Sequence, residues 1–382
     1  MVTTPEKLAQ RRTRGELANL DLLRAVAVGL VFMCHLLATM RVRAMSNLGH
    51  FGVLLFFVHT ALVLMMSMER LGLSGRNLYT AFMVRRFFRI YPLSILSVLI
   101  VVCLRIPPYS WQGAYRWEGW TTFISNLMLT QNLTQSLSLN SVLWSLPFEI
   151  QMYAILPVLF LWALRFPRLR AMAGAWLIAV GIAVAEQIAR PGISGQTFFL
   201  IAPYFPCFCA GVFAWRLMKI RTPKLPGWGW VFFLVALVLG YRLVELLWSF
   251  GPAFGPAVLD AMHGRLRNHR IWYIPPDYLC FVNDWVFCAA VGLTVPYFLE
   301  IRSRWLKWIS KQIARYSYGI YVSHVPILWL CFVRLRVGSV VMSTALTVFL
   351  TALVSVLAYH CLEDPAIRVG KRVAARMVQR RA

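Results

Sequence analysis

Long apolar runs separated by short polar segments dominate this chain. About 20 apolar residues, each rising 1.5 Å in a helix, are enough to cross the hydrocarbon core of a bilayer. The pattern therefore predicts an all-α integral membrane protein with about ten transmembrane helices. We place these helices at residues 20–41, 50–68, 87–105, 144–164, 171–189, 197–217, 228–248, 279–299, 313–333 and 338–361.

The first run, LDLLRAVAVGLVFMCHLLATMR, carries Asp21, Arg24 and His35 within it. Eleven positions separate Arg24 from His35, which at 100° per residue places both side chains on one helix face. Ionisable groups are costly in hydrocarbon, so this face is expected to point to a protein interior or a wet cavity. Arg24 and Asp21 lie near the start of the helix and could instead reach the headgroups. His35 lies about 16 Å deeper, which favours a functional role.

Composition agrees with a membrane protein: 59% of the 382 residues are hydrophobic and 14% are charged, with a mean hydropathy of +0.65. A net charge of +25 would suggest nucleic acid in a soluble protein. Here the basic residues alternate between the two sides of the predicted helices, 27 on one side against 11 on the other. This bias predicts cytoplasmic termini and explains the basicity without nucleic acid.

The chain divides into three predicted parts. Residues 1–19 form a polar cytoplasmic tail that lacks the features of a removable signal peptide, residues 20–365 form a single transmembrane domain, and residues 366–382 form a basic cytoplasmic tail. The eight cysteines lie in or beside apolar segments without metal-site spacing, which indicates buried thiols.

Two outer segments are long, residues 106–143 and residues 249–278. The first contains TTFISNLMLTQNLTQ, whose weak apolarity predicts a short or re-entrant helix rather than a span. Aromatic and basic side chains in these segments could bind a polar acceptor, but Trp and Tyr also gather at bilayer interfaces.

Glu149 is the acidic residue of the fourth predicted helix, in WSLPFEIQMYAILP. Pro147 falls in the first turn, where proline is tolerated, so Glu149 is expected a few residues inside the outer boundary. This is the layer predicted for His35, and a carboxylate beside an imidazole would orient it and support its cation. The alternative is a structural carboxylate bonded to Ser, Tyr or Trp.

A cluster of arginines lies at the cytoplasmic start of the third predicted span, in MVRRFFRIYP. Arg85, Arg86 and Arg89 leave the helix within about one turn, and Arg86 and Arg89 share a face. Guanidinium groups bind phosphates in a bidentate manner, so the cluster could hold a phosphorylated cosubstrate at the cytoplasmic mouth. The alternative is a set of topology determinants and lipid anchors.

Other polar residues lie within the predicted spans. His59 and Thr60 occupy the second span, with His59 close to the expected layer of His35, where it could line the same cavity. Asp284 and His324 could be ligands or interhelical hydrogen-bonding residues. Ser317, Tyr318 and Tyr321 share the ninth span with His324.

Several motifs, in order along most of the chain, resemble the acyltransferase-3 family of integral membrane O-acyltransferases. Arg24 and His35 match its arginine, ten residues, histidine pattern. The remaining matches are GHFGVLLFF to its Gly-x-x-Phe-Phe signature, RRFFRIYP to its RxxR motif, WSLPFE to its Trp-Ser-Leu-x-x-Glu element, and YSYGIYVSHVPIL and LEDP to its late signatures.

The resemblance implies transfer of an acetyl or other small acyl group from cytoplasmic acetyl-CoA or another acyl-CoA to a hydroxyl of a carbohydrate, glycolipid or similar acceptor, with no metal. It implies that His35 is the catalytic histidine, acting as general base or acyl carrier, with Arg24 and Glu149 as partners. The arginine cluster would contact CoA. The expected pocket adds Asp21, His59, Tyr91, Trp144, Ser145, Tyr153, Tyr318 and His324.

One departure from the family pattern concerns the second helix. His59 and Thr60 stand where the family usually has Ser-Gly, which alters the pocket and leaves acyl and acceptor identity open. The chain also lacks the SGNH-type hydrolase domain of some members, so we expect the membrane domain alone to perform the transfer, in the cytoplasmic membrane of a bacterium. A transporter that moves substrate or protons through the same buried His, Glu and Arg is the alternative.

Overall fold

The computed structural model describes residues 17–40, 42, 46–108, 114–189, 201–254, 276–336 and 338–379. Over these residues the fold is helical, with no β-strand, which confirms the predicted all-α membrane protein. Each of the ten predicted apolar runs overlaps a helix, although residue 41 of the first run and residues 197–200 of the sixth run lie outside the described residues. In this part of the chain, eight helices are long and apolar enough to span a bilayer; the helices of the sixth and eighth runs do not meet both criteria, so ten spans are not confirmed.

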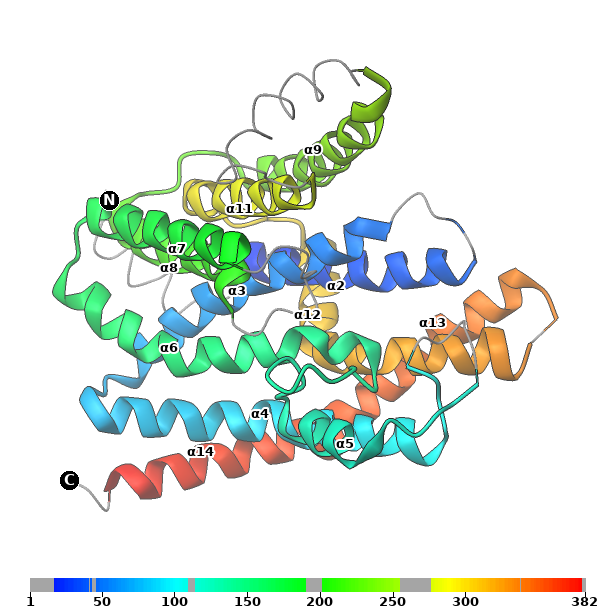
Figure 1. The fold of residues 1–382 in the computed structure, drawn as a ribbon. Helices are drawn as coiled ribbons and strands as arrows, with labels where there is room; N and C mark the ends of the chain where they lie inside the picture. The colour runs from blue at the N-terminus through cyan, green and yellow to red at the C-terminus, as the bar shows by residue number, and fades with distance from the viewer. Residues whose placement is uncertain are drawn as a thin grey trace.

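The helices run lengthwise through one bundle (Figure 1). They are α2 (Ala18–Thr39), α3 (Ser46–Leu71), α4 (Gly75–Cys103), α5 (Gly119–Met128), η2 (Ser141–Ser145), α6 (Leu146–Arg165), α7 (Leu169–Ala189), η3 (Ala202–Tyr204), α8 (Phe205–Ile220), α9 (Gly227–Phe254), α11 (Pro276–Thr294), η4 (Val295–Tyr297), α12 (Arg304–Leu328), η5 (Trp329–Arg334), α13 (Val340–Ala358), η6 (Tyr359–Glu363) and α14 (Asp364–Gln379).

Helix α3 forms the centre of the bundle, with 78% of its most apolar stretch buried. Helices α2 and α8 approach α3 closely because a glycine lies at each of the two contacts. A Cβ on Gly52 would lie 2.6 Å from the Ala27 carbonyl oxygen of α2, and a Cβ on Gly211 of α8 would lie 2.3 Å from the Val58 carbonyl oxygen. Both distances are shorter than any real Cβ contact, so only glycine fits and the three backbones are held at fixed separations.

Helix α4 differs from its prediction in length, because it begins at Gly75 rather than near residue 87 and continues through Pro92. Pro92 removes one backbone donor without ending the helix, as membrane helices tolerate. The arginine cluster therefore lies inside a 29-residue helix and not at its start. Because α4 extends on both sides of the cluster, its arginine side chains lie along the bundle and not at the end of a helix.

The C-terminal segment is also more ordered than a tail. Helix α14 follows α13 through a π-helical turn, Tyr359–Glu363, and lies along α4 (Figure 1). Gly370 permits this contact, since a Cβ there would lie 2.7 Å from Phe88 Cβ. Helix α14 begins at Asp364 and crosses the predicted boundary at residue 365.

The segment between α5 and α6 is held by buried amides. Asn126 donates to the Leu137 carbonyl at 2.8 Å and accepts from the Leu139 N–H at 2.9 Å. Asn140 donates to Ser97 Oγ of α4 at 2.7 Å and to the Val322 carbonyl of α12 at 2.8 Å. These bonds fix η2 beside α12, and the short helix predicted in this segment is confirmed as α5.

The start of α2 is anchored by Asn19, which is 2% exposed. Its amide group donates to the Leu299 carbonyl at 3.0 Å and accepts from the Ile301 N–H at 3.2 Å. Its backbone N–H donates to Glu300 at 2.9 Å. Residues 18 and 19 therefore belong to the transmembrane bundle and not to the N-terminal tail.

Candidate functional site

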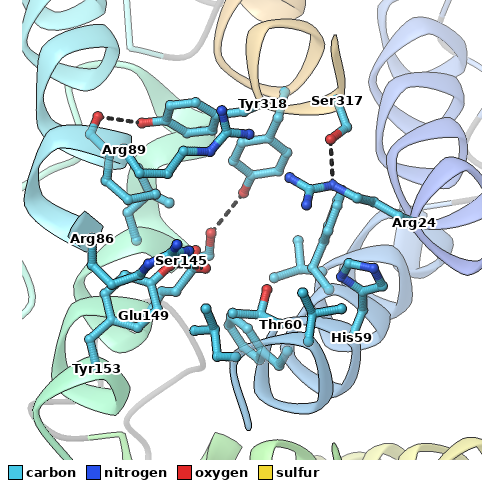
Figure 2. Close-up of a pocket in the computed structure, with 18 residues that line it drawn as sticks. Arg24, His59, Thr60, Arg86, Arg89, Ser145, Glu149, Tyr153, Ser317 and Tyr318 are labelled. Atoms are coloured by element: carbon cyan, nitrogen blue, oxygen red, sulfur yellow. Dashed lines mark hydrogen bonds between the residues drawn. The ribbon is translucent and has the colours of Figure 1, made fainter. Parts of the chain in front are cut away.

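A cavity lies among α2, α3, α4, α6 and α12 (Figure 2). Apolar side chains of α3 form part of the wall, and polar groups converge from all five helices and from η2. The polar lining residues are Arg24, His59, Thr60, Arg86, Arg89, Ser145, Glu149, Tyr153, Ser317, Tyr318 and Tyr321.

Arg24 and His35 both face α12, so the prediction that they share one face of their helix is confirmed. Arg24 Nε donates to Ser317 Oγ at 2.6 Å. His35 Nδ1 lies 3.3 Å from Nε2 of His324, two turns further along α12. Arg24 lines the cavity, whereas His35 is not among its lining residues. His35 therefore occupies the same stripe of α2 beyond the cavity.

Arg89 is held by a buried ion pair. Its Nη1 lies 2.7 Å from Glu363 Oε2, with side-chain exposures of 17% and 1%. Its guanidinium also lies over the Tyr318 ring, 5.8 Å from the centroid, and Tyr318 donates to the Ile90 carbonyl of α4 at 2.8 Å. An ion pair and a ring face together fix one orientation of Arg89 at the cavity wall.

Arg86 also reaches the cavity, but within the part of the chain that the structure describes it forms no ion pair as short as the one between Arg89 and Glu363. It lies beside Glu149 and Tyr153 in Figure 2, and its buried Nε has no hydrogen-bond partner among the described residues. Arg85 is not among the lining residues. Of the three arginines predicted to hold a donor, the structure brings two to the cavity.

Glu149 belongs to the same cavity and accepts a short hydrogen bond from Tyr153, one turn along α6. The depth argument placed Glu149 beside His35; instead it lines the cavity with Arg24, while the ring of His35 contacts His324. Counted depth along a helix does not decide which helix faces meet. In this bundle His35 faces α12, whereas Glu149 faces the cavity.

Ser145 and Tyr321 form a polar contact across the cavity between η2 and α12. Tyr321 donates to the Val142 carbonyl at 2.7 Å, and its oxygen lies 2.8 Å from Ser145 Oγ. Because Tyr321 already donates to a carbonyl, Ser145 is the donor in this contact. The serine of the WSLPFE motif thus links η2 to the helix that carries His324.

His59 and Thr60 present the polar part of α3 to the cavity (Figure 2). His59 is 4% exposed, and its Nδ1 is buried without a hydrogen-bond partner within the described ranges. A buried polar nitrogen in this state is costly unless a bound molecule satisfies it. His59 was predicted to share a cavity with His35; it lines the cavity of Arg24, and His35 is not among the residues that line that cavity.

A second histidine and carboxylate lie beside Trp144. His50 Nε2 is 3.0 Å from Asp284 Oδ2, and Tyr241 donates to Asp284 Oδ1 at 2.8 Å. The Trp144 ring stacks on His50 with an interplanar angle of 9°. Asp284 is therefore a carboxylate bonded between three helices, as interhelical polar residues are.

The other predicted pocket residues fall outside the cavity. Tyr91 donates to the Met128 carbonyl at 3.0 Å, and Asp21, Trp144 and His324 are absent from its lining. The sequence analysis did not assign Glu363 to the site, although it is the glutamate of the LEDP motif and pairs with Arg89 of the cavity wall. No group of three His, Cys, Asp or Glu in the described part of the chain could hold a metal ion.

The fold and the cavity define a polytopic helical membrane protein with a buried cationic chamber. The "Acyltransferase domain" family model matches residues 17–360, and the chain belongs to that acyltransferase-3 family. A similar protein is acyltransferase MdmB of Streptomyces mycarofaciens, 29% identical over 195 residues, 47% of this chain and 47% of that one. The match thus spans about half the length of this curated relative. No solved structure matches the chain.

Proposed function

We propose that this protein is a membrane O-acyltransferase that moves an acetyl or other small acyl group from acyl-CoA to a hydroxyl of a glycan, glycolipid or similar acceptor. The observation that carries the proposal is the arginine-lined cavity on the same stripe of α2 as His35, in a chain of the acyltransferase family. The acyl-CoA enters from the cytoplasm and the acceptor from the outer face of a bacterial cytoplasmic membrane.

Charge makes the cavity suitable for an anionic donor. Three arginines, Arg24, Arg86 and Arg89, line it with one carboxylate, that of Glu149, among the described residues. Glu363 adds a second carboxylate through Arg89, which leaves an excess of one positive charge. Buried charges require partners, so a phosphate group placed against Arg86 would complete the balance.

The spacing along α2 suits a long donor. Arg24 and His35 are eleven residues apart, about 16 Å along the helix axis. Acyl-CoA carries its phosphates and its thioester at opposite ends of an extended arm. Phosphates held at the arginines and a thioester near His35 would therefore use both ends of the stripe.

His35 supplies the chemistry by one of two routes. As general base, its Nε2 accepts the proton of the acceptor hydroxyl while that oxygen attacks the thioester carbonyl, the C–S bond breaks, and the sulfur leaves as CoA thiolate. As acyl carrier, Nε2 attacks the carbonyl first and the C–S bond breaks with release of CoA thiolate. The acceptor oxygen then attacks the acyl carbon, the N–C bond breaks, and the hydroxyl proton passes to the freed Nε2. Both routes require an unprotonated Nε2 on His35.

Release of CoA thiol by purified protein tests the proposal. Wild-type protein in lipid nanodiscs is incubated with acetyl-CoA or longer acyl-CoAs and a panel of alkyl glycosides, free sugars and hydroxylated lipids, and thiol is followed with a chromogenic disulfide. We expect acceptor-dependent release, and His35→Ala is expected to lower turnover by about 10² to 10⁴ while acyl-CoA binding survives. Substrate uptake into liposomes without thiol release would favour a transporter, and a folded His35→Ala variant with normal turnover would refute the role of His35.

A further inference from the structure

The contact between two buried histidines carries a further inference, which rests on the proposed function. We propose that His324 is a positioning residue for His35: its Nε2 accepts a hydrogen bond from Nδ1–H of His35. Together with the Val31 carbonyl, the contact keeps the lone pair of His35 on Nε2, the atom that must react. His324 would thus orient the imidazole from a neighbouring helix without touching the substrate.

The orientation of His324 follows from its backbone contacts. Its Nδ1 lies 3.0 Å from the Ile320 carbonyl oxygen and 2.9 Å from that of Tyr321. Carbonyl oxygens only accept, so Nδ1 carries the hydrogen, and a neutral imidazole then has its lone pair on Nε2. The residue is 0% exposed, so surrounding water does not compete for this nitrogen.

The same argument fixes the hydrogen on His35. Its Nδ1 lies 2.9 Å from the Val31 carbonyl oxygen and 3.3 Å from Nε2 of His324. Both neighbours are acceptors, so Nδ1 of His35 carries a hydrogen that the two share, and Nε2 carries the lone pair. The two rings meet edge to face, with centroids 5.0 Å apart and an interplanar angle of 66°.

Phe32 restrains the pair from another side, because its ring centroid lies 5.9 Å from that of His324. Tyr321, one turn earlier on α12, is fixed by its bonds to Ser145 and to the Val142 carbonyl. The element that carries His324 is therefore tied to η2 and the cavity wall. A side chain on such a rigid support can hold its partner in a narrow range of orientations.

The contact strengthens as the reaction proceeds. When Nε2 of His35 gains the hydroxyl proton or bonds to the acyl carbon, the ring becomes cationic and Nδ1–H becomes a stronger donor. A hydrogen bond from a charged donor is about twice as strong as a neutral one, so His324 stabilises the transition state more than the ground state. The proton stays on Nδ1 throughout, and the effect is expected in kcat rather than in KM for acyl-CoA.

Two substitutions separate positioning from packing. His324→Leu removes the acceptor while keeping an apolar volume, and His324→Gln keeps an oxygen that can accept. With the acyl-CoA and acceptor that give wild-type protein its highest turnover, we expect His324→Leu to lower kcat by about 10- to 10²-fold, less than the roughly 10² to 10⁴ for His35→Ala. KM for acyl-CoA stays unchanged, and His324→Gln lies within a few-fold of wild type.

The double variant and a matched control complete the test. Because His324 acts only through His35, His35→Ala with His324→Leu is expected to be no slower than His35→Ala alone. His360→Leu is the control, since His360 is exposed and its Nε2 contacts Tyr316 at 3.3 Å; it is expected to have normal kcat.

A folded His324→Leu variant with normal kcat would overturn this inference, and so would His324→Leu and His324→Gln losing activity and thermal stability in step. Wild-type protein that releases no thiol with any acceptor would instead refute the proposed function itself. The two failures are therefore distinguishable.

Discussion

The buried ion pair between Arg89 and Glu363 joins α4 to the π-helical turn before α14. Removing it should change the free energy of unfolding by an amount that can be predicted from its burial. With Glu363 at 1% side-chain exposure and Arg89 at 17%, removing one partner leaves the other charge in a largely dry site. Glu363→Ala is therefore expected to destabilise the protein by about 3 to 5 kcal/mol.

The double variant decides whether that cost comes from the pair. Replacing both groups by apolar residues of similar size, Arg89→Met with Glu363→Leu, leaves no buried charge and should recover most of the stability, because such replacements are often neutral or better. Each single variant should thus lose more than the double variant. Activity should not recover together with stability, because Arg89 lines the cavity and is absent from the double variant. The KM of the double variant for acyl-CoA should therefore be higher than that of the wild-type protein.

Asp364 offers a matched control one residue away. It pairs with Arg368 at 2.8 Å, but the two side chains are 35% and 60% exposed, so Asp364→Ala should cost no more than about 1 kcal/mol. Thermal unfolding in one detergent, followed by tryptophan fluorescence, compares all variants. Equal small losses for Glu363→Ala and Asp364→Ala, or additive losses in the double variant, would refute the buried-pair argument.

Three further predictions address topology, donor binding and packing. After the exposed Cys103 and Cys361 are replaced, Trp117→Cys should react with an impermeant thiol reagent from outside and Arg76→Cys should not; reversed labelling would refute the predicted orientation. Arg86→Ala should raise KM for acyl-CoA, and Arg86→Lys should recover little because an ammonium cannot form a bidentate contact; unchanged KM in both would exclude Arg86 as a donor contact. Gly211→Ala, which places Cβ 2.3 Å from the Val58 carbonyl oxygen, should destabilise the protein by about 1 to 3 kcal/mol, whereas Gly174→Ala, with open space around its Cβ, should not.

The sequence by itself determined the helices and one polar stripe. Apolar runs of membrane-spanning length must hydrogen-bond their own backbone, which makes them helices wherever they pack. The spacing of Arg24 and His35 likewise sets their common face through helix geometry alone, and the structure confirms it in their contacts with Ser317 and His324 of α12. These results depend only on local periodicity.

Tertiary structure decided which charges meet. Glu363 reaches Arg89 across 274 positions, and His324 reaches His35 across 289; no local pattern encodes such pairs. Glu149 was assigned to the layer of His35 from counted depth, yet it lines the cavity with Arg24. Side-chain pairing between helices depends on where each helix begins, how far it is shifted along its neighbour and which small residues let the backbones approach, and these quantities exist only in the packed bundle.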